Sequence, residues 1–386
     1  MNKVRELAER PAVQGVLDGF RSQADAIVDL AVEIQQIPSP TFYEEERAGF
    51  VESYLAQIGL EDVAQDALHN VYGCFPGRGE GDPLIISAHT DTVFGLDTDL
   101  SVTRTEKRVS GPGIADNSLG VAGLLTLART FKELGVHAAR DVWFVGNVGE
   151  EGMGDLRGMR AVVERHGRRG IFLVLEGGLF GYICHEAIGV RRYRISVEGP
   201  GGHSWGSFGT PSAVHILGEL IASIVRLNVP ADPKTTFNVG VIEGGTTVNS
   251  IARSASMLLD LRSEEPQALE DMVEQVRGVV ASQERPEGVE IYVEQIGSRP
   301  MGRVARRTQL VRWAAAALKE VDCRNLEYTM ASTDANIPLS YGLPAVCIGL
   351  SRSGNTHRPD EYLEIETIPS GLGQATLLAL AASGIE

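Results

Sequence analysis

The chain has 386 residues, which is enough for two or three domains with a large core. Its 51 acidic and 35 basic residues give a formal net charge of −16, which argues against nucleic acid and anionic membrane surfaces as partners. The four cysteines form no CxxC pair, and no apolar run approaches the ~20 residues that span a bilayer, so we expect a cytoplasmic protein with reduced thiols.

Helices are predicted for residues 2–60, where apolar residues recur at spacings of three and four, as in AIVDLAVEIQQI. Four short apolar runs follow, at 83–88, 142–148, 171–175 and 345–350. Continuous runs of this length suit strands that are buried on both faces of a parallel sheet. Helical patterns at 118–134 and 308–321 lie between the runs, which is the alternation of an α/β domain.

Residues 191–298 show a different pattern. Polar and apolar residues alternate at 191–197, 236–242, 256–261 and 289–296, and helices are predicted at 211–227 and 266–281. The order β-α-β-β-α-β indicates a ferredoxin-like α+β domain. We therefore predict a catalytic α/β domain, with a mixed, mostly parallel sheet flanked by helices, made of residues 1–190 and 299–386 and interrupted by an insert at 191–298.

Residues that can bind metal follow the four apolar runs. His89 and Asp91 come after the first run, Glu150 and Glu151 after the second, Glu176 after the third and His357 after the fourth, while Asp116 precedes the helix at 118–134. Because the carboxyl ends of parallel strands share one edge of a sheet, we expect these side chains to converge. Taken alone, Asp116 could instead cap that helix, and the two adjacent glutamates could simply be solvated.

Two imidazoles and several carboxylates form a ligand set that suits divalent zinc. The candidate ligands number five: His89, Asp116, Glu151, Glu176 and His357. Five ligands are too many for one tetrahedral ion with an open position, and they suit two ions that share a bridging carboxylate. A mononuclear zinc hydrolase remains an alternative at this point.

Four motifs occur in order along the chain. They are S-A-H-T-D-T-V at 87–93, G-E-E-G-M-G-D-L-R-G at 149–158, G-P-G-G-H-S at 199–204 and S-T-D-A-N at 332–336. Together they resemble the co-catalytic zinc exopeptidase family that includes glutamate carboxypeptidase, tripeptidase T, aminoacylase and succinyl-diaminopimelate desuccinylase. The resemblance covers essentially the whole chain and implies a metal-dependent peptidase or amidohydrolase with two divalent ions per chain. Zinc fits the ligand set, and cobalt or manganese is an alternative.

The resemblance also implies which residues share an ion. The implied groups are His89 with Glu176 on one ion, Glu151 with His357 on the other, and Asp116 as the bridge. The peptide bond after the bridging aspartate is cis in relatives, and we expect the same for Asp116–Asn117, although Asn117 departs from the residues common at that position.

Two further residues receive roles next to the ions. Asp91 would orient the imidazole of His89. Glu150 would act as the general base that takes a proton from the attacking water and passes it to the leaving amine.

The insert would serve as a lid and as the interface of a homodimer. His203 would reach the active site of the other subunit, Arg262 would bind a substrate carboxylate, and Asn249 would support the same end of the substrate. The expected reaction is hydrolysis of the amide bond of a short peptide with a free carboxylate. Alternatives are an N-acyl amino acid deacylase with the same chemistry and a non-catalytic scaffold, which the retained Glu150 and ligands argue against.

Overall fold

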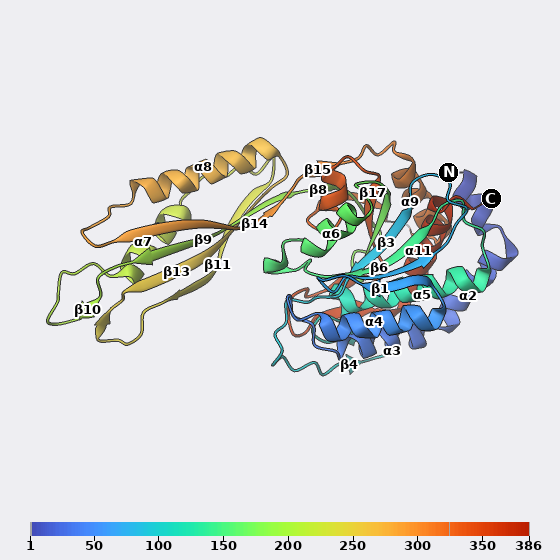
Figure 1. Ribbon diagram of the computed structural model, residues 1–386, viewed down its shortest axis with the longest axis horizontal. Coiled ribbons are helices and arrows are strands. Elements are labelled where there is room, and N and C mark those ends of the chain that lie inside the picture. The colour runs from blue at the N-terminus through green and yellow to red at the C-terminus, as the bar shows by residue number, and fades with distance from the viewer. Residues whose placement is uncertain (1, 324, 386) are drawn as a thin grey trace. The chain divides into compact units, whose positions relative to one another are not determined.

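The computed structural model describes residues 2–323 and 325–385, and the chain divides into two units (Figure 1). Unit 1 comprises Met1–Ala187 and Gly302–Glu386, and unit 2 comprises Ile188–Met301. The range predicted for the insert, 191–298, lies within unit 2.

The first part of unit 1 is helical, as predicted. Its helices are α1 (Asn2–Ala8), α2 (Pro11–Ser22), α3 (Ala24–Gln35) and α4 (Glu45–Ile58). Helix α3 buries Ile27, Val28, Ala31 and Ile34, so its apolar spacing of three and four marks the face that meets the core. In the described part of the chain, no helix has the length and hydropathy to cross a membrane.

Four parallel strands form the centre of the sheet in unit 1. They lie side by side in the order β6 (Val142–Asn147), β3 (Leu84–His89), β7 (Ile171–Glu176) and β17 (Ala345–Gly349). All residues of β3 are buried, because helices cover both faces of the sheet. The four predicted apolar runs are therefore confirmed as buried, mutually parallel strands.

Antiparallel strands extend this sheet on both sides, which makes it mixed, as predicted. On one side β1 (Glu61–Gln65) pairs with β2 (Val71–Phe75), and β2 pairs with β6. On the other side β8 (Tyr182–Ala187) pairs with β17, β15 (Gly302–Arg303) and β16 (Glu327–Ala331). The four central strands were predicted from apolar runs, whereas β2, which is also short, apolar and buried, was not predicted.

Each face of the sheet has its own set of helices. Helices α3, α5 (Leu119–Leu134), α9 (Gln309–Glu320) and α11 (Ile368–Ala382) share one large apolar cluster with one face. Helices α6 (Arg157–Arg165) and α10 (Asn336–Ser340) contribute to a second cluster on the other face. A smaller sheet of β18 (Ser353–Gly354), β19 (Tyr362–Glu364), β5 (Arg108–Ser110) and β4 (Thr103–Arg104) completes the strands of unit 1, and two single-turn helices lie at Gly152–Gly154 and Ile365–Thr367.

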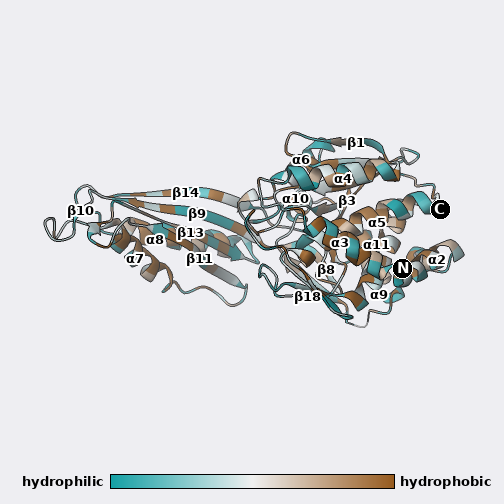
Figure 2. Cartoon of the chain, turned by 90° about the horizontal axis from the view of Figure 1, so that it is seen from below, coloured by the Kyte–Doolittle hydropathy of each residue, from teal (hydrophilic) through white to brown (hydrophobic). Residues whose placement is uncertain are grey.

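Unit 2 is a four-stranded antiparallel sheet with two helices. Its elements are β9 (Gly189–Glu198), α7 (Ala213–Ile224), β11 (Thr235–Gly244), β13 (Ser254–Ser263), α8 (Pro266–Ser282) and β14 (Glu290–Arg299), and the strands lie in the order β11-β13-β9-β14. The hydropathy of its strands alternates along their length because one face packs on the helices (Figure 2). A short pair, β10 (Gly202–His203) with β12 (Ser250–Ile251), was not predicted.

Candidate metal centre

The ends of two neighbouring strands carry the first two predicted ligands. His89 is the last residue of β3, Glu176 is the last residue of β7, and these strands pair in parallel. Their side chains meet at the sheet edge, with His89 Nε2 3.7 Å from Glu176 Oε2. Both residues are at least nine-tenths buried, so the strand ends hold imidazole and carboxylate in a largely water-free place.

Asp116 comes from a turn that precedes α5. The turn spans Ile114–Ser118, and its bond Asp116–Asn117 is cis, which confirms the expectation from the resemblance. The Asp116 Oδ1 atom lies 3.2 Å from His89 Nε2. The other oxygen, Oδ2, lies 3.2 Å from His357 Nε2. One carboxylate therefore faces two different imidazoles.

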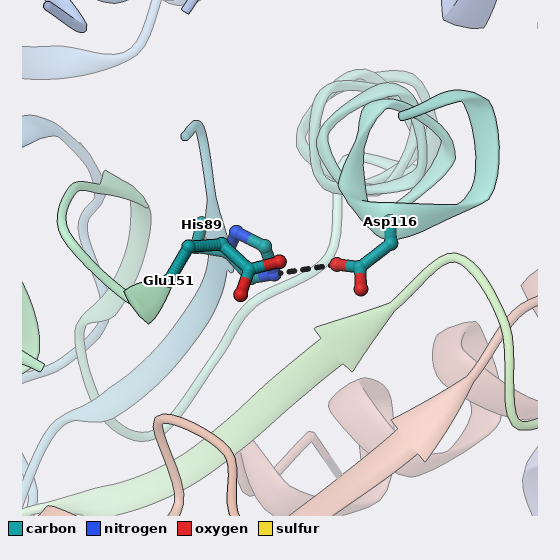
Figure 3. A group of neighbouring side chains, drawn as sticks. All are labelled: His89, Asp116 and Glu151. Atoms are coloured by element: carbon teal, nitrogen blue, oxygen red, sulfur yellow. Dashed lines mark ion pairs between the residues drawn. The ribbon is translucent and has the colours of Figure 1, made fainter. Parts of the chain in front are cut away.

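The second imidazole has a glutamate partner as well. His357 Nε2 lies 3.1 Å from Oε1 of Glu151, which follows β6. Ligand atoms of His89, Asp116 and Glu151 all lie within 4.8 Å of one another, and these three side chains converge in Figure 3. The five predicted ligands thus form two groups, each with one histidine and one glutamate, joined through Asp116.

The charges of this cluster perturb one another strongly. Burial, followed by the charge of Asp116, raises the pKa of Glu151 to about 8. Burial also raises the pKa of Glu176 to about 7, although the attraction of its carboxylate to His89 acts against this. Hydrogen bonds to Asp116 and Glu151 raise the pKa of His357 to about 10. Without cations, Glu151 and Glu176 therefore favour their protonated forms. Cations bound between these carboxylates would favour the charged forms instead.

The donor set fits two divalent cations. Imidazole nitrogens and carboxylate oxygens are ligands that zinc accepts, and the two oxygens of Asp116 already face separate histidine–glutamate groups. Burial opposes ionisation of Asp116, but its hydrogen bonds to His357 and His89 hold its pKa well below the ordinary value. Asp116 therefore stays negative, as a bridging ligand must.

Asp91 lies behind the cluster and is completely buried. Its Oδ1 accepts the backbone N–H of Glu150 at 3.0 Å, and its Oδ2 accepts that of Glu151 at 2.9 Å. The Nδ1 atom of His89 lies 3.0 Å from the Asp91 carbonyl oxygen and 3.6 Å from its Oδ1, so the main-chain carbonyl is the closer acceptor. Asp91 thus holds the imidazole chiefly through its backbone, while its carboxylate holds the peptide groups of the two glutamates.

Several buried polar residues around the cluster were not predicted. Thr41 Oγ1 donates to Asp91 Oδ2 at 2.8 Å, and the buried Arg47 donates to the carbonyl of Thr90 at 2.9 Å. Glu361 accepts backbone N–H groups on both sides of the site. A single sequence gives little indication of such residues, because threonine, arginine and glutamate are common on protein surfaces. These residues support the site only because the fold places them beside it.

One more unpredicted contact joins the sheet to the S-T-D-A-N motif. Asn147 Nδ2 donates to Asp334 Oδ2 at 2.7 Å, and both residues are completely buried. Burial, followed by the charge of Glu150, raises the pKa of Asp334 to about 8. The motif was noted in the sequence, and burial favours the protonated form of its aspartate.

The remaining predicted residues lie in unit 2. His203 in β10 pairs with Ser250, and the N–H of Ser204 donates to the carbonyl of Asn249, so His203 and Asn249 are neighbours. Arg262 is the second-last residue of β13 and is not a neighbour of His203 or Asn249. Its Nε donates to Asp260 Oδ2 at 2.6 Å.

Comparisons with known proteins agree on one family. The model of peptidase family M20/M25/M40 matches residues 85–380. Carboxypeptidase G2 of Pseudomonas sp. (strain RS-16) is 25% identical over 347 residues, which cover 86% of this chain and 82% of that protein.

Solved structures show the same fold. The dipeptidase Dug1p of Saccharomyces cerevisiae has a TM-score of 0.79 at 13% identity, with 98% of this chain and 99% of that chain covered. The Bacillus subtilis YXEP protein, described as a dinuclear metal-binding peptidase, has a TM-score of 0.63 at 16% identity, with 94% and 98% covered.

Proposed function

Because the chain belongs to peptidase family M20/M25/M40, and is therefore an enzyme of the peptidase and amidohydrolase type, we propose that it is a two-metal hydrolase that cleaves the amide bond of a short peptide bearing a free carboxylate. The observation that carries this proposal is that the two carboxylate oxygens of Asp116 face different histidines. Its Oδ1 faces His89, and its Oδ2 faces His357. Relatives named as a carboxypeptidase and a dipeptidase support a peptide substrate.

The five ligands would divide between two ions. His89 and Glu176 would hold one, Glu151 and His357 the other, and Asp116 both. When bound, the ions supply Lewis-acid activation of the scissile carbonyl and of the attacking water. Zinc is the metal that this ligand set favours, with cobalt or manganese as alternatives.

Glu150 is the proposed general base. Its residue is only 6% exposed, and its backbone N–H is held by Asp91, so its position is fixed directly beside the ligand Glu151. Its carboxylate would take the proton from the attacking water and deliver it to the nitrogen of the leaving amine. Removing water from around this carboxylate strengthens its interactions with the reacting atoms.

Arg262 is the proposed site for the substrate carboxylate. Asp260 accepts the Nε–H groups of both Arg262, at 2.6 Å, and Arg192, at 2.8 Å. A guanidinium held through Nε can present its terminal N–H groups to a carboxylate in the bidentate geometry that arginine favours. The proposed substrate end therefore carries a free carboxylate.

Unit 2 would also form the homodimer, with His203 and Asn249 acting at the partner's active site. Three large apolar side chains near these residues are strongly exposed: Trp205 at 88%, Phe208 at 93% and Val248 at 103%. Apolar surface of this kind is typical of an interaction site, so it supports an interface at this end of unit 2. Sedimentation equilibrium of wild type and Trp205→Ser tests it, and a monomeric wild type would refute it.

The reaction is tested with a substrate panel and a metal titration. The zinc-loaded protein should hydrolyse dipeptides or tripeptides with a free C-terminal carboxylate and lose this activity when the carboxylate is amidated. Calorimetric titration of the metal-free protein should show two ions per chain. If the protein hydrolyses only N-acetyl amino acids, it is a deacylase and the peptidase assignment is wrong. If the titration saturates at one ion per chain, the two-metal site is refuted.

A further inference from the structure

Glu361 joins two loops that carry proposed ligands. It lies just before β19, and its side chain is completely buried. Its Oε1 accepts the backbone N–H of Ala115 at 2.8 Å and that of Asp116 at 2.9 Å. Its Oε2 accepts the backbone N–H of His357 at 3.2 Å. One carboxylate therefore receives three N–H groups from segments that are more than 240 residues apart in the chain.

The backbone of His357 needs such support. Its φ angle is 66°, in the left-handed region that residues with a Cβ adopt uncommonly. Its side chain is 51% exposed, so packing alone restrains it weakly. The contact with Glu361 fixes the backbone from which the imidazole projects towards Asp116 and Glu151.

We infer that Glu361 is a positioning residue that sets the distance between the bridging carboxylate of Asp116 and the imidazole of His357, and so assembles the second of the two metal sites. The inference rests on the proposed function. Glu361 is separate from the ligand set itself, because its oxygens are used by backbone N–H groups. Burial, followed by the charge of Asp116, raises the pKa of Glu361, and its three backbone N–H partners act in the opposite direction.

The two oxygens of Glu361 make unequal numbers of bonds, which gives the inference a directional test. In Glu361→Gln the side chain keeps its shape but has one acceptor and one NH₂ donor. The remaining oxygen is best used for the two N–H groups of Ala115 and Asp116, which leaves the NH₂ group opposite the N–H of His357. The variant should therefore release His357 and keep Asp116.

Calorimetric titration of the metal-free protein with Zn²⁺ measures this. One ion should bind about 10- to 100-fold more weakly in Glu361→Gln, as is usual when a partner behind a metal ligand is lost, and the other should bind within about threefold of wild type. The matched control is Glu364→Gln, which removes a charge three residues away that pairs with Arg108. It should bind both ions as wild type does.

Unchanged affinities in Glu361→Gln, or equal weakening of both ions, would overturn the inference while leaving the proposed function in place. A wild-type protein that binds no second ion would refute the proposed function instead, and the inference with it. Hydrogen exchange on the metal-free wild type provides a check that requires no variant to fold. The amides of Ala115, Asp116 and His357 should exchange slowly, and exchange at the rate of an open loop would overturn the inference.

Discussion

Asp91 Oδ1 accepts the backbone N–H of Glu150 at 3.0 Å. The other oxygen of the same buried carboxylate accepts the N–H of Glu151 at 2.9 Å, so one aspartate fixes the peptide groups of two adjacent glutamates with different proposed roles. Asp91 thus controls the geometry of both the proposed general base and a proposed metal ligand.

Replacing Asp91 by Asn should therefore disturb both glutamates. The amide keeps the shape but can accept only one of the two N–H groups and must face the other with a donor. We expect kcat to fall about 10- to 100-fold and zinc affinity to weaken to a similar extent. Steady-state kinetics and calorimetry check this, with Asp99→Asn, which changes an aspartate that bonds only to nearby Ser101 in the described structure, as the control. Wild-type kinetics in Asp91→Asn would contradict the role.

Glu150→Gln should separate chemistry from metal binding. A neutral amide cannot take up a proton, so kcat should fall about 10²- to 10⁴-fold. Because the five proposed ligands are unchanged, metal analysis should still find two ions per chain. The exposed Glu164, changed to Gln, is a control that should keep wild-type activity. Full activity in Glu150→Gln would show that another group accepts the proton.

Asp260→Asn should affect substrates with a free carboxylate selectively. The change weakens the charge-assisted contact that holds Arg262 and leaves the catalytic residues of unit 1 intact. We expect KM to rise about tenfold for a peptide with a free carboxylate and to change little for its amide, with kcat nearly constant. Arg194→Lys, on the same sheet, is the control. An equal rise of KM for both substrates would argue that Arg262 does not bind the carboxylate.

His166 predicts a pH dependence of stability that is unrelated to the metal site. Burial, followed by the charge of Arg165, lowers its pKa to about 4. The unfolded chain takes up a proton near pH 6.5 while the folded protein does not, so stability is lost as the pH falls from about 7 towards 4. With a discount for partial exposure, the loss between pH 7 and pH 5 should be about 1 kcal/mol smaller in His166→Gln.

Urea unfolding of the metal-free protein at the two pH values measures this difference. The exposed His137, changed to Gln, is the matched control and should show the wild-type loss. An equal pH dependence in wild type and His166→Gln would show that the pKa of His166 does not change on folding.

The sequence was most informative where burial is complete. The runs that became β3, β6, β7 and β17 are mostly apolar because both faces of these strands are covered. The apolar spacing of α3 follows its single buried face. Strands β2 and β8 were not predicted. Strand β2 is a short buried apolar run that was missed. Strand β8 contains His185 and Glu186, and its position depends on pairing with β17, a tertiary contact that a local pattern does not contain.

The candidate site, like the fold, was predictable from the sequence only in part. His89 and Glu176 could be predicted because each ends a buried strand. The approach of Asp116 to both imidazoles was expected only from the resemblance, because Asp116 lies in the turn before α5 and His357 in the segment between β18 and β19. Glu361, Arg47 and the Asn147–Asp334 contact could not, because their roles depend on which backbone groups come within hydrogen-bonding distance after folding.

The boundary between the two units has a consequence for the order of folding. Ala187 and Gly302 pair directly across β8 and β15, and Val190 and Arg299 pair across β9 and β14. Closing a flexible loop of more than a hundred residues between β8 and β15 costs about 2–3 kcal/mol more than closing one of a few residues. If unit 2 folds first, its own terminal strands bring these ends together and remove that entropic cost. Prior folding of unit 2 would therefore favour the pairing of β8 with β15.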